Sequence, residues 1–511
     1  MTMGGRWEVF LAIPGIVLTC SAGARAQSCE PVAASVISVQ GDVEVSGHDR
    51  ADWRDVQLNQ VLCAGQQVRL MAKSRAVLRL PNETLLRLDE GSVVTLQPVA
   101  PEKPAWLEFL RGAVHIISRV PRALNIRTPF VNAGIEGTEF ALRVQSEETA
   151  LWVYEGRVRL SNPAGQLLVA SGEAAIAPQG QAPQRRIVVK PRRAVEWALY
   201  YPPLLDTRSE RYPEALRPAV LAYRRNDFTA AFAALDGVPE GARDARYHTL
   251  RVGLLLSVGR VPEAEGDLTS AQRLDPKNGT VYALRSVIAV VRNEQEQALK
   301  LAAEAVRLAP GSATPYVARS YAEQSAFEIE KAQQSIQQAS RLAPEDALVW
   351  ARFAEIELSL GDLDAALEAA TKAETLDPDL ARTQTVLGFA YLTRIEVDEA
   401  RAAFDRAIAR DPADPLPRLG LGLAKIRDGD LDEGTREIET AASLDPNNSL
   451  VRSYLGKAYY EQKRGGLAET EFEQAKLLDP RTLPRGSTTP LTSRPPTTRS
   501  RPCMICRRPS I

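Results

Sequence analysis

The feature that most constrains the fold is a proline that returns at a fixed interval through the second half of the chain. Seven prolines stand 34 residues apart, and an alanine precedes each of them by five residues. The prolines are Pro276, Pro310, Pro344, Pro378, Pro412, Pro446 and Pro480. A constant period of this length indicates a repeat array, in which each unit buries its apolar face only by stacking against its neighbours.

A proline has no amide proton and disfavours a helical conformation at the residue before it, so each of these prolines is expected to end a helix. The period, together with Leu387-Gly388-x-x-Tyr391 and Leu455-Gly456-x-x-Tyr459, resembles the tetratricopeptide (TPR) repeat. The resemblance implies antiparallel helix pairs stacked into an α–α superhelical solenoid over 211–480. Residues 211–244 fit the pattern poorly and predict a degenerate first unit, followed by seven 34-residue repeats.

Residues 30–180 follow a different pattern. Short apolar runs of period two, such as Val43-Glu44-Val45 and Ala76-Val77-Leu78-Arg79-Leu80, alternate with glycine, proline and asparagine turns. Such runs predict antiparallel strands in an all-β sandwich or roll. The expected fold class is therefore α+β multidomain, with a β domain ahead of the solenoid.

The order of motifs in this β region resembles the FecR domain, the extracytoplasmic β domain of iron-dicitrate-type sensory regulators. The most specific match is Thr128-Pro129 followed by Gly137-Thr138-Glu139-Phe140, and Glu155-Gly156-x-Val158 agrees with it. Regulators of that family begin with a cytoplasmic helical region and a transmembrane helix, and neither is expected in the short stretch before this domain. We expect Gly137–Glu139 to form a structural turn or bulge, with a ligand surface as the alternative.

Residues 1–26 predict a secretory signal peptide, with Arg6, an apolar stretch from Val9 to Cys20, and the cleavage pattern Ala24-Arg25-Ala26. A lipoprotein acylated at Cys20 is the alternative. The apolar run is too short to cross a bilayer, and no later run of about 18 apolar residues exists. We therefore expect an exported protein, periplasmic or associated with the cell envelope, without an integral membrane segment.

Export permits a disulfide between Cys29 and Cys63, and two buried free thiols are the alternative. The pair Cys503 and Cys506 lies in a tail without a strand–helix pattern or a nearby histidine, so no redox or zinc site is expected there.

Composition argues against an enzyme or a nucleic-acid-binding protein. The chain has three histidines and no nucleophile elbow, phosphate-binding glycine loop or zinc motif, so we predict no catalytic, cofactor-binding or metal site. His115 is expected to be a structural histidine of a strand. Residues 27–480 carry a net charge of −9, which disfavours nucleic-acid binding.

The two remaining segments are a linker and a tail. Residues 181–210 are basic and then aromatic; Trp197, Tyr200 and Tyr201 are expected to dock the β domain onto the first helices, with an exposed binding patch as the alternative. Residues 481–511 are rich in proline, arginine, serine and threonine and predict disorder. This tail is either a basic arm or the result of a frame interruption in a longer protein.

The first helices of successive repeats are expected to line a concave groove. Positions 23 and 27 residues before the prolines are mostly apolar or aromatic, which predicts a protein or peptide partner of apolar character. The predicted groove residues are Val287, Tyr321, Phe389, Leu419 and Leu423. Packing between repeats is the alternative role for them. The leading hypothesis is a non-enzymatic exported scaffold or adaptor with a FecR-like sensing or anchoring domain. The alternatives are a regulator of FecR-type transmembrane signalling and an envelope enzyme with a TPR module.

Overall fold

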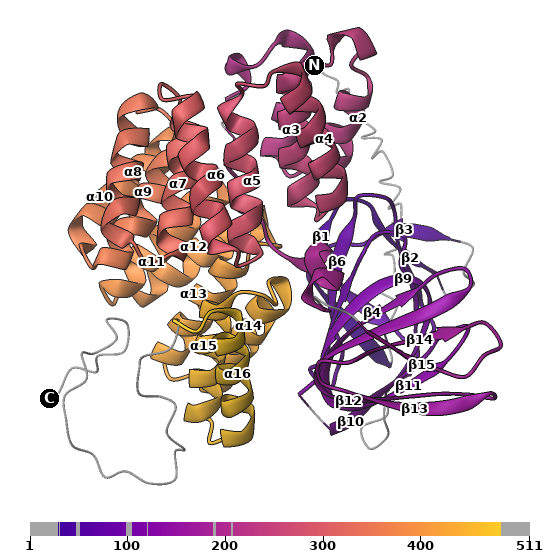
Figure 1. Cartoon of the computed structure of the whole chain (residues 1–511). Coiled ribbons are helices and arrows are strands. Elements are labelled where there is room, and N and C mark those ends of the chain that lie inside the picture. Colours follow the sequence, from indigo (N-terminus) through magenta and orange to yellow (C-terminus); the bar gives the residue numbers. More distant parts are fainter. Residues whose placement is uncertain are drawn as a thin grey trace, which may run out of the picture.

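The structure of the protein, a computed structural model, describes most of the chain. The described residues are 29, 31–47, 52–98, 105–119, 121–187, 191–205 and 208–481. The predicted signal peptide and residues 482–511 of the predicted tail lie outside them. A β domain and a helical solenoid lie side by side (Figure 1), which confirms the predicted α+β fold class.

Strands account for nearly all regular structure in the described part of the β domain. They are β1 (Val32–Gln40), β2 (Val43–Ser46), β3 (Trp53–Asp55), β4 (Val61–Cys63), β5 (Gln67–Leu70), β6 (Arg75–Arg79), β7 (Leu85–Leu88), β8 (Val93–Leu96), β9 (Ala105–Ile117), β10 (Pro121–Arg127), β11 (Asn132–Val144), β12 (Glu148–Asn162), β13 (Gly165–Ala170), β14 (Ala174–Pro178) and β15 (Gln184–Arg186). The main sheet runs β15-β14-β12-β11-β10-β9-β7-β6-β1-β4, and the branch β3-β2-β5-β8 rejoins it at β9.

The long strand β9 makes the sheet fold back on itself. Up to Arg111 it pairs with β8, and from Gly112 onward it pairs with β11. Gly112 has φ +95°, and a Cβ there would lie 2.4 Å from the Cα of Ser92, so only glycine fits this bend. β10 runs parallel to the first half of β9, a departure from the predicted antiparallel pattern that the sharp bend of β9 makes possible. Alternate residues of the strands then fill one enclosed core.

Helices follow in antiparallel pairs from residue 217 onward. They are α1 (Arg217–Arg224), α2 (Phe228–Asp236), α3 (Ala245–Ser257), α4 (Val261–Leu274), α5 (Gly279–Val291), α6 (Gln295–Leu308), α7 (Ala313–Ser325), α8 (Ile329–Leu342), α9 (Ala347–Leu360), α10 (Leu363–Leu376), α11 (Ala381–Thr393), α12 (Val397–Arg410), α13 (Pro415–Arg427), α14 (Leu431–Leu444), α15 (Ser449–Glu461) and α16 (Gly465–Leu478). The 3₁₀ segments η1 (Pro191–Ala198), η2 (Ser209–Arg211) and η3 (Glu214–Leu216) precede α1, and η4 (Glu240–Ala242) lies between α2 and α3. Helices α1 and α2 have 8 and 9 residues, whereas later helices have 13 or 14.

Two local features recur in each repeat, and a third recurs in part of the array. The alanine five residues before the repeat proline is fully buried, and its carbonyl accepts the N–H of the residue that caps the second helix, as Ala407 does from Asp411. Between the two helices one residue has positive φ. This residue is Gly259, Asn293, Phe327, Gly361, Ile395, Gly429 or Lys463. In four places the residue six positions after a repeat proline donates to that proline's carbonyl, as Trp350 Nε1 does to Pro344 at 2.8 Å.

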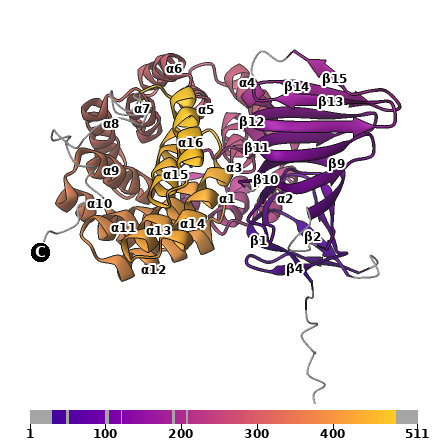
Figure 2. The same ribbon diagram turned by 90° about the horizontal axis from the view of Figure 1, so that it is seen from below.

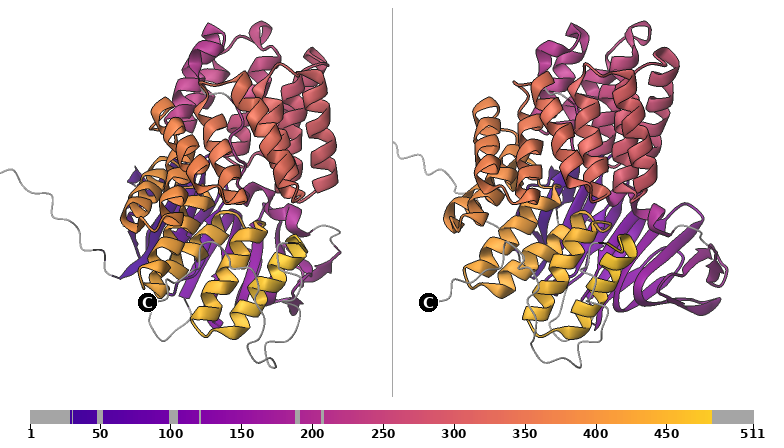
Figure 3. Two further views of the ribbon diagram at one scale, coloured as in Figure 1. Left: turned by 90° about the vertical axis from the view of Figure 1, so that its left-hand side faces the viewer. Right: turned by 60° about the vertical axis from the view of Figure 1, so that its left-hand side comes forward.

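The hairpins follow an arc whose two ends both meet the β domain (Figure 2). The loop between α1 and α2 also contacts the loops of later repeats, since Arg224 pairs with Asp377 at 2.7 Å and Asn226 Nδ2 donates to the carbonyl of Arg410. Figure 3 shows the last hairpins against the strands, and the hydrogen bonds across this boundary agree. Among the described helices, none combines the length and apolar character that a membrane crossing requires.

Replacing a crowded glycine and an open glycine by alanine is expected to change the stability of the protein in opposite directions. Phe404 lies between α11 and α13, and a Cβ on Gly420 would lie 2.2 Å from its ring. We expect Gly420→Ala to lower the free energy of unfolding by about 1–3 kcal/mol, because the crowded ring must move. The matched control is Gly266→Ala on exposed α4, where nothing lies within 4 Å; it should raise stability by about 0.5–1 kcal/mol. Urea unfolding followed by circular dichroism measures both, and an unchanged Gly420→Ala midpoint would contradict the packing described.

Candidate binding surface in the solenoid interior

The predicted groove residues are spread over three apolar clusters. Val287 and Tyr321 belong to the cluster of the first repeats, Phe389 and Leu423 pack around Phe404, and Leu419 lies in the cluster of the last repeats. Val287 and Leu419 are 1% and 2% exposed, so in this structure their side chains pack between helices, the role that the sequence left as the alternative. The other three are half-buried, and their part in binding stays a prediction.

The interior of the arc is occupied by the chain's own linker. Leu199, Tyr201, Leu204 and Leu205 belong to the same apolar cluster as residues of the first repeats. Leu205 contacts Gly253, where an added Cβ would lie 2.7 Å from its Cδ1. Gly253 stands 23 residues before its repeat proline, one of the positions predicted to line the groove. The linker therefore covers part of the predicted groove.

Each half of the aromatic linker contacts a different domain. Val195, Trp197 and Ala198 pack against Ala113 and Ala141 of the sheet. Tyr200, by contrast, donates from its hydroxyl to Asp411 Oδ2 at 3.3 Å, inside the solenoid. The aromatic linker residues thus contact both the sheet and the solenoid, and their docking of the β domain onto the first helices stays a prediction.

Arg75 of β6 holds the linker from the side of the sheet. Its guanidinium donates to the carbonyls of Trp197 (2.8 Å), Leu199 (3.2 Å) and Ser257 (2.5 Å). Burial, and then the nearby Arg260, lower the pKa of Arg75 to about 10, at which the side chain is still charged near neutral pH. One buried cation therefore joins the β domain, the linker and α3.

Ion pairs line the interior beside Tyr200. Arg382 lies 3.2 Å from Glu355 and 3.5 Å from Asp414, and all three belong to first helices or the turns before them. Burial raises the pKa of Asp414 to about 6 even though Arg382 opposes the shift. Arg382 and Asp414 are 5% and 1% exposed, so these ion pairs belong to the buried part of the interior.

A cavity of about 250 Å³ remains next to the linker. Linker residues Tyr200, Tyr201 and Pro203 form one wall. The opposite wall comes from the loop after α1 and from the loops before α11 and α13, including Arg224, Asp379, Leu380, Arg410 and Asp411. This is the part of the interior that the chain's own segment leaves unfilled.

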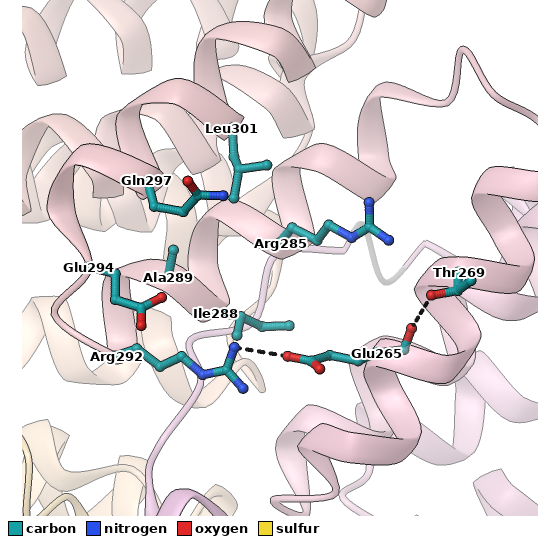
Figure 4. A pocket seen from close by; sticks show the side chains of 9 residues that line it. All are labelled: Glu265, Thr269, Arg285, Ile288, Ala289, Arg292, Glu294, Gln297 and Leu301. Carbon is teal, nitrogen blue, oxygen red and sulfur yellow. Dashed lines mark hydrogen bonds and ion pairs between the residues drawn. The ribbon is translucent and has the colours of Figure 1, made fainter. Parts of the chain in front are cut away.

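A second cavity, of about 380 Å³, lies between α4, α5 and α6 (Figure 4). Arg292 on its wall is already paired, with Glu265 at 2.8 Å and Glu196 at 2.9 Å. Gln297 and Leu301 come from α6 and face Glu265 and Thr269 of α4 across the opening.

A buried ion cluster joins the β domain to the last repeat. Arg452 of α15 is fully buried and lies 2.7 Å from Glu139 of β11 and 3.1 Å from Glu471 of α16. Arg119 adds a pair with Glu155 at 2.6 Å and another with Glu471. Two cations and three carboxylates from both domains are thus paired where water is excluded.

Electrostatics fixes the protonation of this cluster. Burial by itself would raise the pKa of Glu139, but Arg452 and His115 bring it well below its usual range. Burial lowers the pKa of His115 in spite of Glu139, so the imidazole is neutral and donates from Nε2 to the carboxylate at 3.1 Å. His115 is therefore a buried strand residue with a structural partner. At the predicted turn Gly137–Glu139, the backbone pairing of β11 with β12 shifts its register between Glu136 and Glu139.

Arg452 is not among the residues predicted from the sequence, although the repeat pattern contains a signal for it. The position six residues after each repeat proline is aromatic in the second to fourth clear repeats, for example Tyr316 and Trp350, and becomes arginine in the last two. Arg418 donates to the carbonyl of Ile37 at 3.3 Å, and Arg452 reaches Glu139. The two repeats that carry arginine there are thus the ones that reach the sheet through this position.

Strands β6 and β7 make a second contact between the sheet and the last repeats, at the end of α14. Arg87 is 2% exposed and donates to the carbonyls of Ser443 (3.1 Å) and Leu444 at the end of α14. Val77 and Leu85 pack on Leu444 beside it. A cation next to unpaired helix carbonyls is favourable, which compensates in part for the burial that lowers the pKa of Arg87.

The final helix, α16, is only partly covered. Leu478 is 8% exposed and Phe472 is half-buried, whereas Leu477 is 72% exposed. Glu471 of the same helix pairs with Arg119 of the β domain.

The two cysteines at the start of the β domain are joined in the structure. Cys29 and Cys63 form a disulfide with a Cα–Cα distance of 5.2 Å, which ties the residue before β1 to the end of β4. The described residues contain no group of three or more His, Cys, Asp or Glu side chains arranged to hold a metal ion.

Comparisons with known proteins agree with this architecture. The family model described as FecR protein matches residues 66–159, and the tetratricopeptide repeat model matches 251–313, 318–381, 385–434 and 419–481. The chain carries a FecR domain followed by TPR repeats. The resemblance to the FecR domain and to TPR repeats, predicted from the motifs, is confirmed. FecR domains are associated with the cell envelope, and neither family is a catalytic one.

Solved structures resemble parts of the chain at low identity. The Cut9–Hcn1 hetero-tetramer of the APC/C is 17% identical with a TM-score of 0.43, covering 57% of this chain and 60% of that one. TTC0263, a TPR protein of Thermus thermophilus, is 19% identical with a TM-score of 0.32, covering 36% and 99%. A putative anti-sigma factor from Parabacteroides distasonis is 16% identical with a TM-score of 0.24, covering 27% and 67%. No curated protein matches the sequence.

The buried ion cluster predicts a large effect of one arginine. We expect Arg452→Met to lower the free energy of unfolding by about 3–5 kcal/mol, because Glu139 and Glu471 lose their shared cation inside the protein. The double variant Arg452→Met/Glu139→Leu should lose less than the sum of the single variants. Arg401→Ala is the control, since its pair with Asp428 is exposed and contributes at most about 1 kcal/mol. Chemical unfolding of the four variants tests this, and equal losses for Arg452→Met and Arg401→Ala would contradict it.

The raised pKa of Asp445 predicts that the free energy of unfolding depends on pH. Burial raises the pKa of Asp445 from 3.8 to about 6 although Arg87 opposes the shift, so the folded state takes up a proton there at a higher pH than the unfolded state. Its contribution to stability therefore rises as pH falls from 7 to 5, by roughly 1 kcal/mol. Asp445→Asn lacks this gain. Urea unfolding at both pH values should show the wild type gaining on the variant, and a difference that is constant with pH would contradict this assignment.

Proposed function

We propose that the protein is a non-enzymatic scaffold, exported to the periplasm or cell envelope, that binds a protein partner of apolar character through the interior of its TPR solenoid. One observation carries the proposal. The interior already holds an extended, non-helical stretch of polypeptide, Leu199–Leu205, by apolar burial and a tyrosine–carboxylate hydrogen bond. A surface that holds such a segment from its own chain has the shape and chemistry to hold one from another protein.

The FecR domain supplies the anchoring or sensing part of this proposal. Its Glu139 pairs with Arg452 of the last repeat, and its Arg75 donates to the linker that occupies the interior. A change at the sheet is therefore transmitted to the binding surface through direct contacts. This coupling also favours the second candidate function, an extracytoplasmic regulator of FecR-type signalling. The two functions differ in whether the captured partner belongs to a signalling complex of the membrane.

Site-specific crosslinking tests the proposed surface. A photoreactive residue is placed at Arg224 or Asp379 on the cavity wall, and at Leu274 of α4 as the control, which is 53% exposed and lies outside the cavity lining. In an envelope fraction, both cavity positions should crosslink the same protein, at least about tenfold more than the control, because only they line the interior. Equal yields at all three positions, or none at the cavity, would refute the interior as the binding surface.

A further inference from the structure

The occupied interior of the solenoid shows what kind of segment it accepts. The occupant reads Tyr200-Tyr201-Pro202-Pro203-Leu204-Leu205 and has no helical or strand structure. Two successive prolines fix an extended backbone and offer no N–H groups, so such a segment loses little conformational freedom on binding. Its side chains, rather than its backbone, then carry the recognition.

The contacts bear this out. Tyr201, Leu204 and Leu205 are 3%, 7% and 8% exposed, although they belong to an irregular segment. In the described chain, no backbone–backbone hydrogen bond connects residues 200–205 to other residues. The segment is thus held by side-chain burial and by the Tyr200–Asp411 hydrogen bond, interactions that a second peptide of the same kind reproduces.

The fit of the resident segment is incomplete. The hydroxyl of Tyr201 is buried without a hydrogen-bond partner, which is unfavourable. The cavity of about 250 Å³ lies beside Tyr200, Tyr201 and Pro203. A ligand that fills this space and satisfies a polar group at that position has an advantage over the resident segment.

Release of the segment leaves the domain junction in place. The preceding residues Val195, Trp197 and Ala198 pack in a separate cluster with the sheet. The ion cluster around Arg452 and the contact of Arg87 with α14 do not involve the linker residues 199–205. The segment is therefore able to leave while the FecR domain stays docked.

We infer that residues 200–205 are a resident ligand of the TPR interior, and that the partner presents an extended aromatic–Pro–Pro–Leu segment that replaces them. The inference rests on the proposed function and names the chemistry of its partner. An open TPR groove binds whenever a ligand is present, whereas this interior binds only ligands that outcompete a tethered segment. Affinity is then set by the difference between the two occupants.

The probe is a fluorescein-labelled peptide of residues 197–208 of this chain, added to the full-length protein. We expect Tyr200→Ala/Leu205→Ala to bind it at least about tenfold more tightly than the wild type, because the weakened resident segment competes less. Leu221→Ala, on an exposed site of α1, is the matched control and should bind as the wild type does. A peptide of the same composition with the two prolines separated should bind to none of them. Fluorescence anisotropy gives the affinities, and circular dichroism shows that the variants are folded.

A second measurement covers the case in which the double variant does not fold. In a chain with Cys20, Cys503 and Cys506 replaced by serine, Leu204→Cys is alkylated with and without the unlabelled peptide. The peptide should accelerate alkylation several-fold by displacing the resident segment, and the peptide with separated prolines should not.

Three outcomes are decisive. A folded double variant that does not bind the peptide, equal binding of both peptides, or alkylation unaffected by peptide would each overturn the inference. If partner crosslinks appear at the cavity while peptide 197–208 does not bind, the proposed function stands and the resident-ligand inference fails. If the peptide exchanges but no partner crosslinks, residues 200–205 are a displaceable segment, and the proposed function fails together with the partner chemistry inferred from it.

Discussion

The structure depends on the pairing of Arg452 with Glu139 and Glu471 inside the protein. A guanidinium taken out of water is tolerated only when carboxylates and carbonyls replace its hydration, and here they come from two domains. Because Glu139 lies on β11 and Arg452 on α15, satisfying this one charge fixes the last repeat against the sheet. Arg87 and Arg75 do the same at α14 and at α3, so three buried cations hold the solenoid at both of its ends.

A solenoid held at both ends differs from one that is free. Glu471 of α16 pairs with Arg119 of the β domain, and the linker packs with the first repeats in one apolar cluster. The concave face is consequently part core and part surface. Val287 and Leu419 belong to the core, whereas Arg224, Asp379 and Tyr200 border open space. In the proposed function, recognition is therefore the exchange of a partner segment for the resident one.

Features of this protein that depend on neighbouring residues were predictable from the sequence, whereas features that depend on distant contacts were not. The proline period gave the helix pairs because a helix end is decided within a few residues, and the alternating runs gave the strands for the same reason. Arg87 shows where such reasoning stops. Within Leu85-Leu86-Arg87-Leu88 it occupies the place of a solvent-facing residue, yet it is buried, because α14 covers that face of the sheet. No pattern within the strand records the arrival of a helix more than 350 residues away.

The sequence by itself determined the two fold types, their order, the repeat length and the composition of the segment that joins them. Only the tertiary structure decided that the joining segment packs inside the solenoid, that Glu139 is an interdomain partner, and that Leu478 at the end of the array is buried. The physical reason is the range of the interactions. Helix ends, turns and strand alternation depend on neighbours along the chain, whereas burying a charge depends on which groups meet it in space, and Glu139 and Arg452 are 313 residues apart.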